Sequence, residues 1–537
     1  MHFKQHSHLG KLRRVSKKIF LDTNWWYWIP GILMFPAFVL LYSRVHNTLN
    51  PDLIAYFSVA RHYQEFNWIQ AFNSYWSPLI CWLLALIPSL KSDPMTSFRI
   101  VNIVAAFALY HQLYFWIRLV VNNILNRFLL CLLLATLFVQ LALFIGTPDF
   151  LSLLLFLIFL KILIRYRSKT RQSVFLGLSI LLCFFSKTFL LLLCLSIVGV
   201  YFFYIKIILK EKLFLKPLLL TLIVVATGLF IWASCLKMHY GYYTLSSAST
   251  LNNSVAIPSQ EPFYLAEPPF PKSLFLWEDP VFIKVLPAYL GAPGITLKDQ
   301  FLRWKYNWKI TLYYFQYISF LWIWILILPI IGLFQKRNRQ LKICLLLFTV
   351  FLMNWFGYFL IFIHERYLIV GQAALYMSIF GFMEIILRKN RWMSKYKYIQ
   401  IIPVSLLFIS MVKNPVHELR YGMSIYTTQD HYIHQANALA RSGILKEKKI
   451  ATFSNSLPLY DYLSLACFLG GGKYYGEVWV HKPHQEQWKE INRFKVDYIA
   501  VYDCDFFDSD CDKKNWLSSL PIVYQDPIIK VKLLAVH

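Results

Sequence analysis

The sequence predicts a polytopic α-helical membrane protein with about 11 transmembrane helices and a small extracytoplasmic α/β domain at its C-terminus. Three observations lead to this fold class. Of the 537 residues, 58% are hydrophobic and only 15% are charged, a balance that soluble domains do not have. Apolar runs of about 20 residues recur, and each is long enough to cross about 30 Å of hydrocarbon. From about residue 413 onward the chain turns polar.

The basic residues define the topology. The formal net charge of +27 comes from Lys and Arg that cluster between the apolar runs, which indicates cytoplasmic loops and not nucleic-acid binding. Basic residues from Lys11 to Lys18 precede the first run, and no cleavage site is evident. We therefore expect an uncleaved anchor with a cytoplasmic N-terminus. The expected spans are 25–43, 99–117, 128–146, 150–165, a hairpin over 173–206, 217–236, 313–334, 343–363, 367–387 and 399–412.

Between the spans, the run at 78–90 is too short to cross and is expected to be re-entrant or interfacial. This topology divides the chain into a transmembrane domain at 1–412 and an outer α/β domain at 413–537, with strands near 450–453 and 498–502 and a helix at 429–442. The first outer loop covers 44–98, and a long Pro-rich outer loop covers 237–310. Four charged residues fall on the outer face: Asp52, Asp149, Lys187 and Arg366.

Asp52 begins a segment that reads as a helix along the membrane surface, because Asn50 and Pro51 are typical of a helix start. The spacing places Leu53, Tyr56, Phe57, Ala60 and Tyr63 on one face, with Ser58, Arg61, His62 and Glu65 on the other. Asp52 is either a functional carboxylate aimed into the bundle or only a helix-capping residue.

Each of the other outer charges also has two interpretations. Asp149 follows Thr147 and Pro148, so it is a functional acid or a helix N-cap. Lys187 lies within a long apolar run and either pairs with an anion or extends to the interface. Arg366 suits a phosphate but could pair with Glu365.

No metal site is indicated, although a divalent metal remains compatible with the sequence. The nine Cys residues lack metal-type spacing, and six of them lie in apolar segments where small core residues are expected. His364 has no second ligand at a suitable spacing. The acidic stretch from Asp503 to Asp512 reads as a solvated loop more readily than as a calcium site, and a disulfide between Cys504 and Cys511 is possible. Gly470 to Gly472 read as a turn.

Several short motifs together resemble the GT-C membrane glycosyltransferases, in particular the family 39 protein O-mannosyltransferases and the lipid A aminoarabinose transferases. The likeness covers about residues 20–390 and follows the family order: Asp52 with Tyr75 to Leu79, Pro148 with Asp149, Phe185 to Lys187, Tyr240 with Gly241, Trp277 to Pro280, and Glu365 to Leu368. The chain departs from the family pattern at Leu53, where an acidic residue is common, at the single Pro78 and at Thr188.

The resemblance implies an inverting transfer of a sugar from a polyprenyl-phosphate donor to a hydroxyl of a lipid, an envelope glycan or a protein. In this interpretation Asp52 is the base, Asp149 positions the acceptor or the neighbours of Asp52, and Lys187 and Arg366 hold the donor phosphate. Tyr56, Arg61, His62, His364, Glu365 and Tyr367 support them. The relatives suggest a bacterial inner membrane, with the C-terminal domain periplasmic or extracellular. The alternatives are a transporter or flippase for a lipid-linked saccharide, which would favour internal repeats that the sequence lacks, and a non-enzymatic scaffold.

Overall fold

The computed structural model describes most of the chain. The described residues are 25–45, 51–144, 146–166, 169–203, 215–248, 265–270, 272–274, 276–282, 297–316, 339–361, 363–389, 401–453, 457–478, 483–502 and 516–536. The basic N-terminal residues, the acidic stretch from Asp503 to Asp512 with its two cysteines, and most of the span expected at 313–334 lie outside these ranges.

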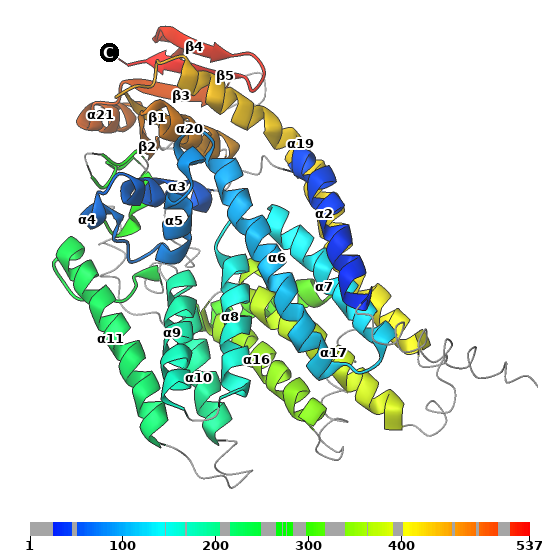
Figure 1. Ribbon diagram of the computed structural model, residues 1–537. Coiled ribbons are helices and arrows are strands. Elements are labelled where there is room, and N and C mark those ends of the chain that lie inside the picture. The colour runs from blue at the N-terminus through cyan, green and yellow to red at the C-terminus, as the bar shows by residue number, and fades with distance from the viewer. Residues whose placement is uncertain are drawn as a thin grey trace, which may run out of the picture.

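The prediction of a polytopic helical membrane protein is confirmed. Among the described residues, six helices are long and apolar enough to cross a membrane. They are α2 (Trp25–Val45), α6 (Pro94–Val120), α7 (Ile124–Phe144), α11 (Leu215–Tyr240), α16 (Arg339–Ile361) and α17 (Ile369–Lys389). The shorter apolar helices α8 (Asp149–Ile164), α9 (Thr170–Ser186) and α10 (Phe189–Phe203) lie in the same bundle (Figure 1). The expected hairpin over 173–206 is α9 followed by α10, with Lys187 at the bend.

The first outer loop contains α3 (Pro51–Gln64), α4 (Trp68–Ala71), α5 (Pro78–Ala85) and η1 (Pro88–Lys91). Because α5 has only eight residues, about 12 Å of helix, the run at 78–90 does not cross the membrane. The expectation of a two-faced surface helix at α3 is wrong. Every residue from Leu53 to Ala60 is buried, and so is His62, because α4, α5 and, from the long outer loop, η3 (Leu276–Glu278) all pack against α3.

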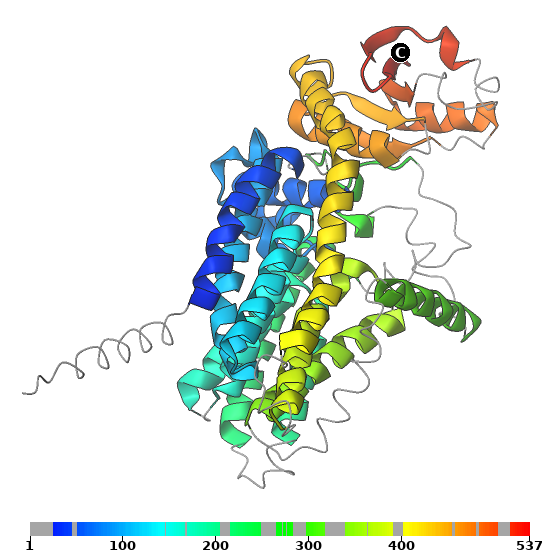
Figure 2. The same ribbon diagram turned by 90° about the vertical axis from the view of Figure 1, so that its right-hand side faces the viewer.

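The long outer loop is shorter than the sequence suggested. Helix α11 continues to Tyr240, and α14 (Leu297–Gln316) begins well before residue 310. Between them, η3 and η4 (Pro280–Phe282) are the described pieces of regular structure. Figure 2 shows α14, in green, projecting from the side of the bundle. Asn307 of α14 donates to the carbonyl of Phe359 at 2.8 Å, and this bond anchors α14 to the outer end of α16.

Helix α19 (Ile401–Arg441) carries the chain from the bundle to the outer domain as one helix of 41 residues (Figure 2). The domain boundary expected between 412 and 413 therefore falls inside a helix, and the helix expected at 429–442 is its last part. The long continuous helix leaves no flexible linker at this point, which fixes the direction in which the outer domain leaves the bundle.

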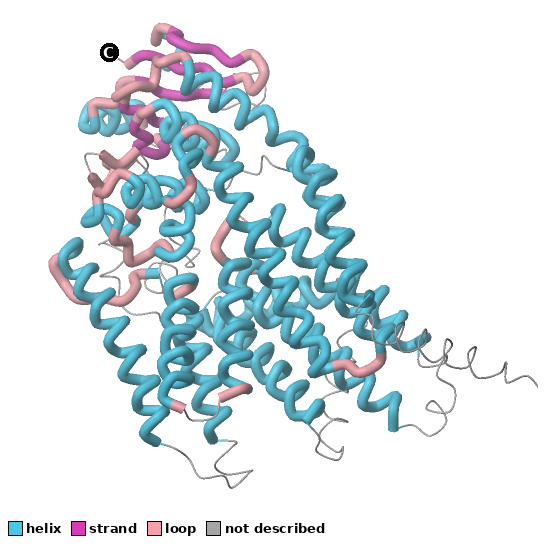
Figure 3. The backbone as a smooth tube through the Cα atoms, viewed as in Figure 1, coloured by secondary structure: helices cyan, strands magenta, loops and turns pink. Residues whose placement is uncertain are grey.

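The outer domain is the expected small α/β unit. Its sheet has the order β2-β1-β3-β5-β4, and all described strands gather at one end of the molecule (Figure 3). The elements are β1 (Lys449–Thr452), α20 (Leu457–Gly470), β2 (Lys473–Glu477), α21 (His484–Phe494), β3 (Tyr498–Tyr502), η8 (Leu517–Ser519), β4 (Ile522–Asp526) and β5 (Val531–Ala535). Strands β1, β2 and β3 are parallel, and β5 pairs antiparallel with β3. Gly471, in a left-handed conformation at φ +74°, makes the expected turn between α20 and β2.

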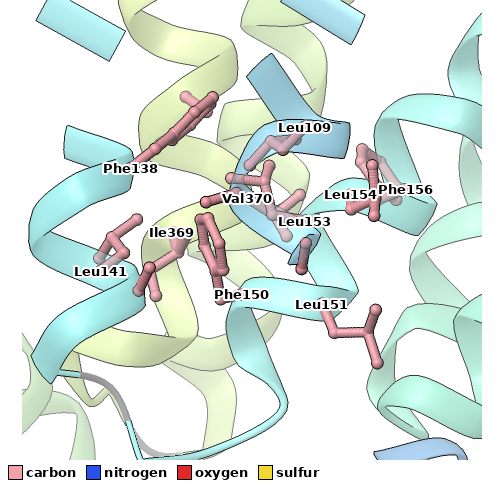
Figure 4. Packing of buried hydrophobic residues seen from close by; sticks show 14 of the residues in the cluster. Leu109, Phe138, Leu141, Phe150, Leu151, Leu153, Leu154, Phe156, Ile369 and Val370 are labelled. Atoms are coloured by element: carbon pink, nitrogen blue, oxygen red, sulfur yellow. The ribbon is translucent and has the colours of Figure 1, made fainter. Parts of the chain in front are cut away.

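The core of the bundle positions the outer ends of three helices. Phe150 of α8 packs on Phe138 of α7 with ring centroids 5.9 Å apart, and Ile369 and Val370 of α17 lie beside them (Figure 4). Asp149 directly precedes Phe150, and Arg366 lies three residues before Ile369. The same packing therefore holds the first residue of α8 close to the segment that leads into α17.

Candidate functional site

A cavity of about 470 Å³ lies where the outer ends of the helices meet the first outer loop. All four charged residues that the sequence placed on the outer face line it: Asp52, Asp149, Lys187 and Arg366. The remaining lining is mostly aromatic and aliphatic: Tyr56, Tyr75, Trp76, Ser77, Thr147, Pro148, Phe184, Thr188, Phe189, Leu191, Leu192, Leu245, Ser246, Ala248, Tyr358, Ile361 and Tyr367. A few charges thus meet in a largely apolar space, as in ligand sites generally.

Asp52 and Arg366 form the first ion pair of the cavity. The Asp52 carboxylate lies 2.7 Å from Nη2 of Arg366, although more than 300 residues separate them in the chain. Asp52 is in the first turn of α3, and Arg366 is on η5 (Glu365–Leu368). The alternative that the sequence left open, a pair of Arg366 with Glu365, lies outside the described side chains. The Nε of Arg366 is buried and has no hydrogen-bond partner among the described residues.

Lys187 and Asp149 form the second ion pair. The Lys187 ammonium donates to the Asp149 carboxylate, and Thr147 donates to the other carboxylate oxygen at 2.6 Å. Lys187 is in extended backbone between α9 and α10, and its ammonium also lies 3.9 Å from the centre of the Tyr367 ring. Lys187 therefore points into the cavity and does not extend to the interface. Its contact with the Tyr367 ring is a cation–π interaction.

The supporting residues expected from the sequence separate into two groups. Tyr56 and Tyr367 line the cavity, and the charged cavity residues contribute to the pKa shift of His364. Desolvation and the Arg366 cation lower the pKa of His364 to about 4, so its ring is neutral at pH 7. Arg61 instead pairs with Glu65 at 2.9 Å, and His62 bonds to Glu278. The side chain of Glu365 is not among those described.

A buried polar network beside the cavity was not expected from the sequence. The Glu278 carboxylate accepts hydrogen bonds from Ser58 and Ser273 and contacts His62. Its neighbour Asp279 accepts from Tyr240 at 2.6 Å and contacts His239. The signal that could have found this network is the acidic pair between Trp277 and Pro280, which the resemblance included without a role.

The network holds a cavity wall in place. The side chain of Asn73 donates to the Glu278 carbonyl at 2.8 Å, and the Trp76 indole donates to the Trp277 carbonyl at 2.9 Å. These bonds fix the segment from Asn73 to Ser77, whose Tyr75, Trp76 and Ser77 line the cavity. Burial raises the pKa of Asp279, although hydrogen bonds from His239 and Tyr240 oppose this.

The chemistry of the cavity follows from its charges. Two cations stand opposite two carboxylates, so the site has little net charge until a ligand enters. A guanidinium and an ammonium are the usual partners of a phosphate, and the wall of Phe184, Phe189, Leu191 and Leu192 suits an apolar chain. An anion with an apolar tail therefore fits the site. The described residues contain no group of three or more His, Cys, Asp or Glu that could hold a metal ion.

No family model and no curated protein matches the sequence. Several solved structures resemble this one, and three of them are described here. ArnT from Cupriavidus metallidurans bound to undecaprenyl phosphate matches with a TM-score of 0.51 and 11% identity over 94% of this chain and 97% of that chain. An Archaeoglobus fulgidus oligosaccharyltransferase with Zn and sulfate matches at 0.49, with 10% identity over 88% of this chain and 68% of its own. The oligosaccharyltransferase AglB of Archaeoglobus fulgidus, with an inhibitory peptide and a dolichol-phosphate, matches at 0.43, with 10% identity over 89% and 69%.

The likeness to ArnT extends over nearly the whole of both chains. At this level of identity it establishes a common fold, and the GT-C resemblance expected from the sequence is confirmed for the fold.

Proposed function

We propose that this protein is a membrane glycosyltransferase that moves a sugar, with inversion, from a polyprenyl-phosphate donor to an acceptor hydroxyl. The observation that carries the proposal is the cavity in which Lys187 and Arg366 stand beside Asp52 and Asp149 against an apolar wall. The matched structure of ArnT holds undecaprenyl phosphate, a ligand of the chemistry that this cavity suits. We place the cavity at the outer face of a bacterial inner membrane.

In the proposed complex the donor phosphate lies between Lys187 and Arg366. The Arg366 guanidinium already donates to Asp52 through Nη2. Its buried Nε has no hydrogen-bond partner among the described residues, so it can donate to a phosphate oxygen. The prenyl chain lies along Phe184, Phe189 and Leu192. As the sugar leaves, negative charge builds up on the phosphate oxygen, and two fixed cations stabilise that charge more than they stabilise the ground state.

Asp52 is the proposed base. The acceptor oxygen forms a bond to the anomeric carbon while the bond from that carbon to the phosphate oxygen breaks, and the electron pair leaves with the phosphate. The hydroxyl proton passes to Asp52. When a phosphate oxygen also binds Arg366, the ion pair between Arg366 and Asp52 weakens. The Asp52 carboxylate can then accept this proton. Asp149 holds Lys187 in position through their ion pair.

The test is label transfer in membranes. Cells producing the wild type or Asp52→Asn are fed a radiolabelled sugar, and label is followed from the polyprenyl-phosphate fraction into the envelope fractions. We expect the wild type to move label and Asp52→Asn to lose at least about 100-fold of the rate. Asp497→Asn is the control, because Asp497 pairs with Lys448 in the outer domain and does not line the cavity.

Two results would contradict the proposal. If Asp52→Asn moves label as fast as the wild type, Asp52 only caps α3. If the wild type leaves the label on the carrier but moves that carrier across the bilayer, the protein is a transporter or flippase. The chemical nature of the labelled product identifies the acceptor as a lipid, an envelope glycan or a protein.

A further inference from the structure

Helix α14 (Leu297–Gln316) has an inverted pattern of burial. The residues that it buries are the polar Arg303, Asn307 and Thr311, which lie four positions apart and form one stripe along the helix. A helix that packs on a protein in water normally buries its apolar residues instead. On α14 the large apolar and aromatic side chains are between 38% and 64% exposed, and they are Phe301, Leu302, Trp304, Tyr306, Trp308 and Leu312. Water alone is therefore a poor surrounding for α14.

The buried polar stripe attaches α14 to the end of α16. Asn307 donates to the Phe359 carbonyl at 2.8 Å and accepts from the Ile363 amide at 3.0 Å. Between Phe359 and Ile363 lies Ile361, which lines the cavity. Helix α14 is thus fixed beside the end of the bundle that carries the cavity, and its exposed side chains lie on the faces that do not contact α16.

Two lysines run along the middle of the exposed side. Lys305 comes two residues after the buried Arg303, which is about 200° around a helix of 3.6 residues per turn, so Lys305 lies opposite the buried stripe. Lys309 follows one turn later on the same face, and both lysines are exposed. The rows that flank them are Trp304 with Trp308 on one side and Leu302 with Tyr306 on the other.

The kinds of residue on this side are typical of a membrane boundary. Helix α14 is not among the six described helices that are long and apolar enough to cross a membrane. The span α11 exposes mainly aliphatic side chains to its surroundings, such as Leu219, Ile223 and Ile231. Trp and Tyr are instead enriched where hydrocarbon meets water, because their rings are apolar while the N–H or O–H group stays hydrated. The exposed side of α14 therefore has the composition of an interfacial helix.

Charge and position indicate which surface α14 contacts. From Gln300 to Gln316 the helix contains three cationic residues and no acidic residue. Lysines beside aromatic rows are attracted to anionic lipid headgroups, and their long stems let the ammonium reach the phosphates. Figure 2 shows α14 projecting from the side of the bundle, and the sides of a membrane-spanning bundle face lipid. A lipid surface thus fits the helix better than a protein partner does.

We propose that the exposed side of α14 binds the anionic headgroup layer of the leaflet beside the cavity. Trp304 and Trp308 lie at the boundary with the acyl chains, and Lys305 and Lys309 contact the lipid phosphates. Because the polar stripe holds α14 on both sides of Ile361 in the chain, the lipids that α14 binds lie next to the cavity. The proposal does not depend on which reaction the cavity performs.

The test captures lipids on the full-length protein in nanodiscs made of equal parts of phosphatidylglycerol and phosphatidylcholine. A photoreactive benzophenone amino acid replaces Trp308, and mass spectrometry identifies the lipids that become attached on irradiation. We expect phosphatidylglycerol to be enriched about 25-fold, because each lysine at an anionic surface contributes a factor of about 5. Lys305→Gln should lower this enrichment about 5-fold, and Lys305→Gln/Lys309→Gln should abolish it.

Two controls match the probe and the charge. The same benzophenone residue in place of Trp488, on α21 of the outer domain, should capture no lipid. Lys489→Gln removes an exposed lysine from α21 and should leave the enrichment at Trp308 unchanged. Lys305→Arg/Lys309→Arg keeps both charges and should keep the enrichment. It also provides the comparison with the single variant if the double Gln variant does not accumulate.

Three outcomes would overturn the proposal. If the probe at Trp308 captures no lipid, or captures no more than the probe at Trp488, α14 does not lie at the membrane boundary. If both lipids are captured equally and the lysine substitutions change nothing, α14 does not select anionic headgroups. Capture of a protein in place of lipid would show that α14 is a docking site for that protein. None of these results involves label transfer, so they leave the proposed function to its own test.

Discussion

Two groups of acids lie close together in this protein, and they differ in their bonding partners. In the cavity, Asp52 and Asp149 each pair with a cation, and side chains of both ion pairs retain contact with solvent. In the neighbouring network, Glu278 and Asp279 are only 1% exposed and are bonded to hydroxyl groups and imidazoles. In the cavity, a ligand can compete for the charged side chains. In the network, protein groups enclose the acids completely.

This difference separates acids that take part in ligand binding from acids that hold the structure in place. A phosphate can enter the cavity by taking over one side of an existing ion pair, because the Nε of Arg366 has no hydrogen-bond partner among the described residues. No comparable exchange is open to Glu278, whose partners Ser58 and Ser273 would be left unpaired in a buried space. The cavity charges should therefore control activity, and the enclosed acids should control stability.

The largest expected effect comes from removing a cavity cation. Lys187→Met should lower label transfer by about 100- to 1,000-fold, because a fixed charge on the leaving phosphate is lost. The same change leaves Asp149 without its cation and should destabilise the protein by about 3 kcal/mol. Transfer in membranes and the melting temperature of the purified protein measure the two effects.

The double variant Lys187→Met/Asp149→Asn distinguishes the loss of activity from the loss of stability. It should recover most of the stability, since no charge remains unpaired, but none of the activity. If activity returns with stability, Lys187 is structural and the contrast between the two groups of acids is lost.

The enclosed network gives the next largest effect. Glu278→Ala should lower the stability by about 2–3 kcal/mol, because several buried donors lose their acceptor. Hydrogen exchange should increase in the segment from Asn73 to Ser77, which the network holds in place. Undecaprenyl phosphate should still bind at low temperature. A variant that keeps its melting temperature but loses binding would place Glu278 with the cavity charges.

The sequence predicted that the four charged cavity residues lie on the outer face, but it did not predict which residues they contact. The basic clusters predicted the topology, and that predicted topology put Asp52, Asp149, Lys187 and Arg366 on one side. Ion pairs between segments more than 300 residues apart depend on how helices pack, as with Asp52 and Arg366, and no local pattern encodes that. The neighbour Glu365 was therefore as reasonable a partner for Arg366 as Asp52.

Helical periodicity was misleading at α3 for a related reason. Ser58 and His62 follow the spacing of a solvated face, yet η3 covers them and Glu278 bonds to both. A polar face predicts contact with water or with other polar groups, and periodicity does not distinguish the two. Asp461 was not singled out because it lies in an apolar helix, α20, that the sequence analysis did not predict.

A smaller effect tests the geometry of the phosphate site. Arg366→Lys keeps the charge but loses the planar fork, so one side chain can no longer serve Asp52 and a phosphate at once. We expect undecaprenyl phosphate to bind about 10-fold more weakly, close to 1.4 kcal/mol. The melting temperature should change little, because the pair with Asp52 is retained. Equal affinity in a titration of the two proteins would show that a point charge suffices.

The smallest effect concerns Asp461 of α20, which belongs to neither group. Its Oδ1 is shielded from solvent and has no hydrogen-bond partner among the described residues. Its folded pKa of about 7 lies above that of an exposed Asp, so its contribution to stability is complete at low pH and is lost as the pH rises to about 7. Asp461→Asn should therefore raise the melting temperature relative to the wild type at pH 8, by an amount corresponding to about 1 kcal/mol. At pH 5 the folded wild type carries a protonated Asp461, and the advantage of the variant should shrink. Paired melting curves at the two pH values measure the difference, with Glu278→Gln as a comparison in which stability falls at both. An equal shift at pH 5 and pH 8 would mean that Asp461 does not change its charge in this range.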